Sequence, residues 1–212
     1  MENTALRDGG KAGQMRSDVY TTDGYLSLIK LSEEDKDNYI ELLKQISEIN
    51  GFYDNPDNVE LVWRTAFSRN ELDYSIYDAS GEYCGNIVLN HWEEPTPEIG
   101  IDLVEPKRNK GIAAKCIKLL ARRVYEERND IEHFILRVSS GNPHSRHMIE
   151  KMGAIYIGEE ETLIKLAMKV IKDVMEGEDY KKVQDRYREF LEKKPEAEKE
   201  VVYRYKLTSD VF

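Results

Sequence analysis

The segment from Arg108 to Ala113 places a basic side chain and a glycine directly ahead of a run with helical periodicity. A helix that begins at Gly111 presents backbone N–H groups without partners inside the helix, together with the positive end of its dipole. Phosphate groups bind in this environment, and pyrophosphate is the natural ligand. The sequence therefore predicts a phosphate-binding turn. The helix is indicated by apolar residues spaced along one face, at Ile112, Cys116, Leu119, Leu120 and Val124.

The chain as a whole is acidic, with 41 Asp and Glu residues against 31 Lys and Arg residues and a net charge of −10. This charge disfavours a nucleic-acid partner and favours cationic ligands. An anionic ligand at the turn needs local positive charge, which Lys107, Arg108, Lys110 and Lys115 supply. No apolar run approaches membrane-spanning length, so we expect a soluble protein with no membrane partner.

The turn must be held between a strand and a helix. Residues 98–104 alternate and predict the strand, which Pro106 ends because proline lacks a backbone N–H donor. Two further strands, 72–79 and 83–92, precede it without an intervening helix and predict an antiparallel meander. The passage from the turn through its helix to a strand at 135–138 predicts a parallel crossover.

The remaining elements complete a mixed sheet. Residues 25–30 predict a first strand, and Ser32, followed by acidic residues, predicts a helix start. A second helix is expected around 59–67 and a closing strand at 201–207. The predicted fold class is therefore α/β (α+β), with a mixed, mostly antiparallel, twisted sheet and helices on both faces.

Two motifs give the chain a resemblance to a known family. Val104-Glu105-Pro106 precedes the turn, and a second stretch runs from the strand at 135–138 through Asn142-Pro143-His144-Ser145 to Glu150-Lys151-Met152-Gly153. Their order and spacing resemble the GCN5-related N-acetyltransferases (GNAT), whose coenzyme loop reads Arg/Gln-x-x-Gly-x-Gly/Ala. The resemblance covers about 25–157, with Ala154 in place of the usual aromatic residue. It is closest to the ribosomal-protein and peptide amino-terminal acetyltransferases.

The resemblance implies that acetyl-coenzyme A (acetyl-CoA) is the acyl donor. Backbone groups around Leu103 and Val104 would bind the pantetheine arm, one N–H polarising the thioester carbonyl. Arg108 would contact phosphate or brace the loop, and Asn142 would bind pantetheine or simply cap a helix. The pyrophosphate would meet the N–H groups of the turn, those of Asn109, Lys110, Gly111, Ile112, Ala113 and Ala114.

The same resemblance suggests two proton-transfer groups. Glu98, at the start of the strand before the turn, would accept the amine proton directly or through water, or would be an ordinary surface carboxylate. Many family members protonate the thiolate with a tyrosine, but this chain has Ile149 at that position. Ser145 is the predicted substitute beside the sulfur, with a structural helix position as its alternative. Tyr156 is a further candidate for the acid that protonates the thiolate.

Composition, periodicity and the family pattern together predict the domain organisation. Residues 1–20 are expected to form a flexible leader, and 21–212 a single GNAT-like domain. Two amphipathic helices separated at Gly177 are predicted to form a helical hairpin inserted at about 159–195, before the last strand. Their apolar faces would either cover the domain or form a homodimer surface.

The predicted activity is acetyl transfer from acetyl-CoA to a primary amine, by direct attack in a ternary complex. The acceptor is either a peptide or protein amino terminus or a small cationic amine. The alternative is a catalytically weak module of the same fold that senses acyl-coenzyme A. No metal site is expected, since His144 and His147 lack further ligands nearby in sequence. Cys84 and Cys116 show no zinc spacing, consistent with a reducing cytoplasm.

Overall fold

The structure is a computed structural model that describes residues 18–47, 51–68, 71–174 and 176–212. It consists of two compact units. The first comprises the described residues up to Ile87 together with Ile101–Leu120, and the second comprises Val88–Gly100 and Ala121–Phe212. The expectation of one domain over 21–212 stays a prediction. Of the expected leader, residues 1–17 lie outside the described residues, and Val19 begins the first strand.

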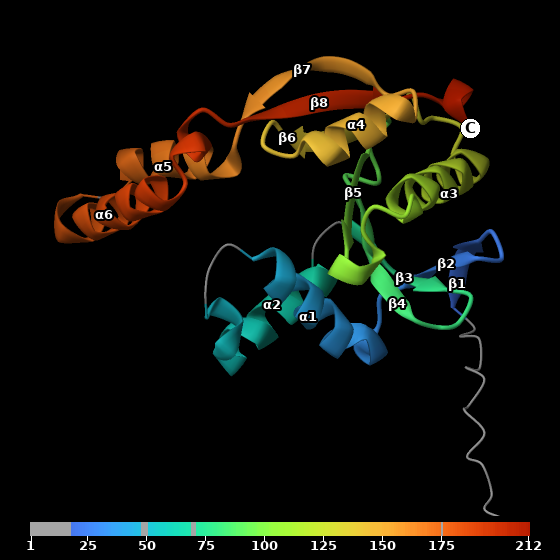
Figure 1. The fold of residues 1–212 in the computed structure, drawn as a ribbon, viewed down its shortest axis with the longest axis horizontal. Coiled ribbons are helices and arrows are strands. Elements are labelled where there is room, and N and C mark those ends of the chain that lie inside the picture. The colour runs from blue at the N-terminus through green and yellow to red at the C-terminus, as the bar shows by residue number, and fades with distance from the viewer. Residues whose placement is uncertain (1–17, 48–50, 69–70, 175) are drawn as a thin grey trace, which may run out of the picture. The chain divides into compact units, whose positions relative to one another are not determined.

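The first unit combines an antiparallel sheet with helices (Figure 1). Its strands are β1 (Val19–Thr22), β2 (Leu26–Lys30), β3 (Glu71–Asp78), the first part of β4 (Tyr83–Asn90) and the last part of β5 (Glu98–Leu103). Its helices are α1 (Lys36–Ile46), α2 (Pro56–Ser68) and the start of α3 (Ile112–Glu127). β2 pairs antiparallel with both β1 and β3, and its register with β3 runs from Leu26↔Asp78 to Lys30↔Tyr74.

A capping box sets the entry to α1. The Ser32 N–H donates to Asp35 Oδ2 at 2.9 Å, and the Ser32 side chain accepts from the Glu34 N–H at the short 3-10 turn before the helix. Asp35 is buried, and its other oxygen accepts the Tyr77 hydroxyl at 2.6 Å. The predicted helix start is confirmed, and one buried carboxylate ties this start to β3.

The core of the first unit includes Trp63 of α2. This side chain is 2 % exposed and packs edge-on against Tyr39 and Phe67. Its indole N–H donates to Glu33 Oε2 at 3.0 Å, which satisfies the one polar group of the ring. Trp63 therefore stabilises the fold.

An ion-paired lysine fastens the β3–β4 turn. Lys107 Nζ lies 2.8 Å from Asp78 Oδ2 and 2.6 Å from Glu82 Oε2. Burial alone would raise the pKa of Asp78, but hydrogen bonds from Lys107, Ser80 and the turn backbone hold it well below its usual range. The pKa of Lys107 is raised by its hydrogen bonds to Asp78 and Glu82. The pair therefore stabilises the folded state as long as Asp78 is ionised.

We expect Lys107→Met to lower the free energy of unfolding by about 1 to 2 kcal/mol at neutral pH, since it leaves a partly buried carboxylate unpaired. Because the pKa of Asp78 is lower in the folded state, the stabilisation is complete above the unfolded pKa of about 3.9 and is lost as pH falls through the folded value. Urea unfolding at several pH values measures this. Lys44→Met, which removes an exposed pair with Glu41, serves as the control. Equal losses for both variants would contradict the prediction.

The second unit contains the parallel crossover and the carboxyl-terminal strands. It takes in the end of β4, the start of β5 and the rest of α3, followed by β6 (Phe134–Ser139), α4 (Pro143–Lys151), β7 (Ile155–Glu161), α5 (Leu163–Val174), α6 (Gly177–Lys193) and β8 (Val201–Leu207). β5 and β6 run parallel, and β8 pairs antiparallel with β6 on one side and β7 on the other. The hydrogen-bonded strand order β1-β2-β3-β4-β5-β6-β8-β7 gives the predicted mixed, mostly antiparallel sheet.

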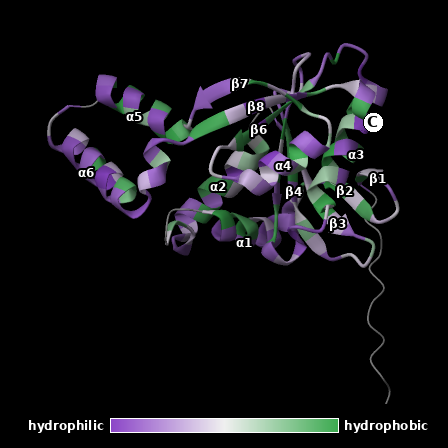
Figure 2. Ribbon diagram, turned by 45° about the horizontal axis from the view of Figure 1, so that its top comes forward, coloured by the Kyte–Doolittle hydropathy of each residue, from purple (hydrophilic) through white to green (hydrophobic). Residues whose placement is uncertain are grey.

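Helices α5 and α6 lie side by side at one end of β7 and β8 (Figures 1 and 2). β7 extends to Glu161, so the helical pair begins later than the predicted 159. α5 leaves four apolar side chains of one face well exposed, at Leu163, Leu166, Val170 and Val174. This face does not cover a core within the described part of the unit. No helix among the described residues has the length and apolar character needed to cross a membrane.

Candidate functional site

The predicted phosphate turn lies in the first unit, between β5 and α3. A 3-10 turn, Glu105–Lys107, follows β5, with Pro106 in its first turn. Arg108 then folds back, and its Nε donates to the Leu103 carbonyl at 2.8 Å. This contact fixes the loop against the end of the strand. This contact is compatible with the bracing role of Arg108, and its contact with phosphate stays a prediction.

Backbone conformation shapes the turn for an anion. Asn109 and Gly111 have φ angles of +58° and +75°, in the left-handed region that glycine adopts without strain and asparagine tolerates. The first bond of α3 at this point runs from the Lys115 N–H to the Gly111 carbonyl at 3.2 Å. The amides of Ile112, Ala113 and Ala114 therefore precede the helical hydrogen-bond ladder.

The space in front of Gly111 is open. A Cβ built on this residue meets nothing within 4 Å among the described residues. Lys110 and Lys115 are exposed beside the turn, whereas Lys107 is neutralised by Asp78 and Glu82 and adds no free charge to the predicted basic patch. Free amides, a helix dipole and two exposed ammonium groups fit a pyrophosphate.

At the end of β5, one of the backbone N–H groups that the family resemblance assigns to the pantetheine arm already has a hydrogen-bond partner. The Val104 N–H donates to the Cys84 carbonyl at 3.1 Å, so it is not a free donor for a thioester carbonyl. The strands are close here because Gly85 has no side chain: a Cβ at Gly85 would lie 2.1 Å from the Asp102 carbonyl oxygen. Of the two predicted pantetheine contacts, Leu103 remains the candidate N–H donor.

Glu98 lies in the second unit, where β5 pairs with Ile135 of β6. Its side chain is 17 % exposed, and its Oε2 is 3.2 Å from Arg137 Nε. Burial raises the pKa of the carboxyl, and this effect outweighs the lowering by Arg137. A carboxylate with a raised pKa is a stronger base, so the environment of Glu98 suits proton acceptance.

Asn142 and Ser145 meet at the start of α4 in the second unit. Asn142 Oδ1 accepts from the Ser145 N–H at 3.0 Å, so Asn142 caps the helix and retains its side-chain NH₂ for other contacts. Ser145 is half-buried, and its hydroxyl makes no hydrogen bond to another described residue. Ile149 is 3 % exposed and fills the core at the usual tyrosine position.

The further candidate acid, Tyr156, lies on β7 and is half exposed. Its hydroxyl hydrogen-bonds Glu159 Oε1 at 3.3 Å. Slight burial and the neighbouring Glu159 raise its pKa, which makes it a weaker acid. The structure gives Tyr156 no advantage over Ser145 as a proton donor.

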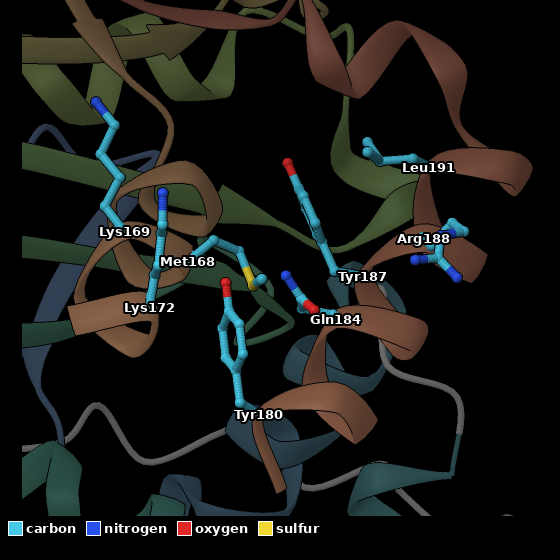
Figure 3. Close-up of a pocket in the computed structure, with 8 residues that line it drawn as sticks. All are labelled: Met168, Lys169, Lys172, Tyr180, Gln184, Tyr187, Arg188 and Leu191. Atoms are coloured by element: carbon cyan, nitrogen blue, oxygen red, sulfur yellow. The ribbon is translucent and has the colours of Figure 1, made fainter. Parts of the chain in front are cut away.

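A groove of about 520 Å³ between α5 and α6 contains none of the predicted site residues (Figure 3). Tyr180 points toward Met168 and Lys172 across it. Two of its basic side chains are paired, Lys169 with Glu161 at 2.6 Å and Arg188 with Asp185 at 3.1 Å. Cys84 and Cys116 are buried. Within the described ranges, no cluster of three or more His, Cys, Asp or Glu side chains is arranged to hold a metal ion.

The structure thus groups the predicted residues in three places: the turn with Leu103 and Val104, Glu98 with its ion pair, and Asn142 with Ser145. The sequence analysis does not identify Arg137, the ion-pair partner of Glu98, nor Glu160 and Arg204, which continue the chain of ion pairs. The available signal is a charged residue within a strand, such as Arg137 between the buried Leu136 and Val138, but the partner of such a residue cannot be identified without the strand register.

The mixed sheet, with a glycine-containing turn between β5 and α3, is the fold of the GNAT class of acyltransferases. The acetyltransferase (GNAT) domain family matches residues 26–155, more than half of the chain. The chain belongs to this family and is an N-acetyltransferase. No curated protein sequence matches it significantly.

Solved structures share the fold at low sequence identity. A spermidine N-acetyltransferase from Vibrio cholerae, described as dodecameric and in an intermediate state, is 17 % identical, with 88 % of this chain and 95 % of that chain covered and a TM-score of 0.59. The Vibrio cholerae spermidine N-acetyltransferase in complex with CoA and spermine is 18 % identical over 66 % and 86 %, with a TM-score of 0.53. A spermidine/spermine N-acetyltransferase from the same organism, in complex with manganese ions, is 17 % identical over 87 % and 92 %, with a TM-score of 0.57. These likenesses do not single out the amino-terminal acetyltransferases within the family.

Proposed function

We propose that this enzyme transfers the acetyl group of acetyl-CoA to a primary amine by direct attack in a ternary complex. The observation that carries the proposal is the turn at Asn109–Gly111. Two positive φ angles coincide there with open space and with amides of α3 that have no partner among the described residues. Such a turn can bind the pyrophosphate of the coenzyme chiefly through its backbone.

Each of the candidate residues has a role in the proposed chemistry. Leu103 would bind the pantetheine arm, and an oriented N–H there would stabilise the developing oxyanion. Glu98 would accept the proton of the attacking amine, supported by its burial and raised pKa. Ser145 would donate a proton to the departing thiolate, supported by its unpaired hydroxyl, and Asn142 would contact pantetheine through its NH₂ group.

A small polyamine is the acceptor we favour over a peptide amino terminus. The net charge of −10 attracts cations, and one structure of similar fold contains CoA and spermine. A polyamine nitrogen with a pKa near 10.4 must lose its proton before attack, so its acetylation requires a base such as Glu98. We further propose that the enzyme acts in the cytoplasm, supported by two buried free cysteines, and self-associates, supported by the exposed apolar face of α5.

An amine panel tests the proposal. We expect the protein to release thiol from acetyl-CoA with spermidine or spermine faster than with peptides bearing a free α-amine. Faster turnover with peptides would reassign the acceptor. Coenzyme binding in calorimetry without transfer to any amine would favour the acyl-CoA sensor. The absence of both binding and transfer would contradict the proposal.

A further inference from the structure

Four charged side chains form a chain of ion pairs across the strands of the second unit. Arg137 Nε on β6 lies 3.2 Å from Glu98 Oε2 on β5 and 3.4 Å from Glu160 Oε2 on β7. Arg204 Nε on β8 lies 2.9 Å from Glu160 Oε1. The order along the chain of contacts is therefore Glu98, Arg137, Glu160, Arg204, with alternating sign and no net charge.

The strand register explains why this arrangement exists. Arg137 and Arg204 are direct partners in the antiparallel ladder of β6 and β8, where two like charges repel. Glu160 on β7 contacts both of them, one carboxylate oxygen to each, and compensates this repulsion. Arg137 lies two residues beyond Ile135, the partner of Glu98, so it projects from the same face of the sheet as Glu98.

Because Arg137 contacts two carboxylates, it stabilises the ionised form of Glu98 less than an arginine paired with Glu98 alone would. Its Oε2 contacts the arginine, while its Oε1 has no ion-pair partner in the part of the chain that the structure describes. Arg137 is held from its other side by Glu160, which limits how far the guanidinium can turn toward Glu98. One oxygen of Glu98 is thus fixed, and the other is available to an incoming amine.

We infer that Arg137 is a positioning residue for Glu98, and that Glu160, by sharing Arg137, keeps Glu98 basic enough to accept a proton. This inference rests on the proposed function, because the ion pairs affect catalysis in this way only if Glu98 is the base. Arg204 holds Glu160 in the geometry that permits the sharing.

The inference requires opposite effects from the two neighbours of Glu98. Removing Arg137 takes away the cation that contacts Glu98 and leaves the carboxyl near Glu160, so Glu98 releases its proton at higher pH. Removing Glu160 leaves Glu98 as the carboxylate that Arg137 contacts. The guanidinium then stabilises ionised Glu98 more strongly, and Glu98 releases its proton at lower pH. A purely structural disturbance would not move the two variants in opposite directions.

We expect the acidic limb of the pH profile of kcat/KM to move up by roughly one pH unit in Arg137→Gln and down by a smaller amount in Glu160→Gln. Arg137→Lys, which keeps the charge, should restore most of the wild-type profile. Arg188→Gln, which removes an exposed ion-paired arginine of α6, is the matched control and should not move it. His91, after β4, also faces Glu98, so the shifts should persist in a His91→Gln background.

A carboxyl-carbon NMR titration of Glu98, assigned by its loss in Glu98→Gln, measures the same shifts without catalysis. Opposite NMR shifts with an unmoved rate profile would overturn the role in catalysis and count against Glu98 as the base. Shifts in both measurements support the inference. Shifts of the same sign in both variants, or no shift in either, would overturn it. Where Arg137→Gln or Glu160→Gln fails to fold, Arg137→Met or Glu160→Met, which also remove the charge, replaces it.

Discussion

Gly111→Glu is expected to abolish coenzyme A binding, with a loss in affinity of about 100-fold or more, equivalent to about 2.7 kcal/mol. The substitution forces a side chain into a φ of +75°, which costs roughly 1 to 2 kcal/mol. It also places a carboxylate where the pyrophosphate would meet the amides of α3, so repulsion adds to the strain. Isothermal titration calorimetry with coenzyme A measures the loss.

Gly24 offers a matched control for this substitution. It also has a positive φ, +86°, and open space at its Cβ, but it lies in the turn between β1 and β2. Gly24→Glu should therefore carry similar strain and charge without loss of affinity. Gly111→Ala adds the strain alone and should lose less than Gly111→Glu. Unchanged affinity in Gly111→Glu would refute the assignment of the turn.

Glu98→Gln is expected to lower kcat by about 100-fold or more near pH 7, as for loss of a general base. The loss should be smaller near pH 9.5, where more of the amine is already neutral. In the wild type, activity should fall on the acid side as Glu98 takes up a proton, at a pH above that of an ordinary glutamate because its pKa is raised by burial. Steady-state rates across this pH range measure both effects.

Glu132→Gln, which changes an exposed carboxylate in the same unit, is the control and should leave kcat unchanged. An equal loss at both pH values in Glu98→Gln would indicate a structural role. Full activity at neutral pH would remove Glu98 from the mechanism.

Local sequence signals predicted most of the fold. The capping pattern at Ser32 and the apolar spacing from Ile112 to Val124 define helices through contacts between neighbours in sequence, and both helices are present. β7 was missed because all three of its apolar residues, Ile155, Tyr156 and Ile157, come in succession and are exposed, so no alternation marks a strand. In the structure it forms a strand by pairing with β8, much later in the chain.

The candidate site likewise contains local features that the sequence predicts and contacts between strands that it does not. The turn at 109–111 is a local feature, and its conformation follows from glycine and from the helix that begins there. The Val104 N–H is paired with Cys84, and Glu98 is paired with Arg137, across neighbouring strands of the sheet. Shifting a strand by one residue would turn its side chains to the opposite face, so such pairs require the register.

The placement of α5 and α6 between β7 and β8 affects the order in which the protein folds. Glu161 pairs with Val201, so the ladder closes a segment that contains both helices. Closing a long flexible loop costs conformational entropy before any strand contact compensates for it. Helices form from local contacts on a faster timescale and shorten the flexible length that remains. The helical pair therefore spans the distance between the two strands, and we expect β8, which lies between β6 and β7, to join the sheet late in folding.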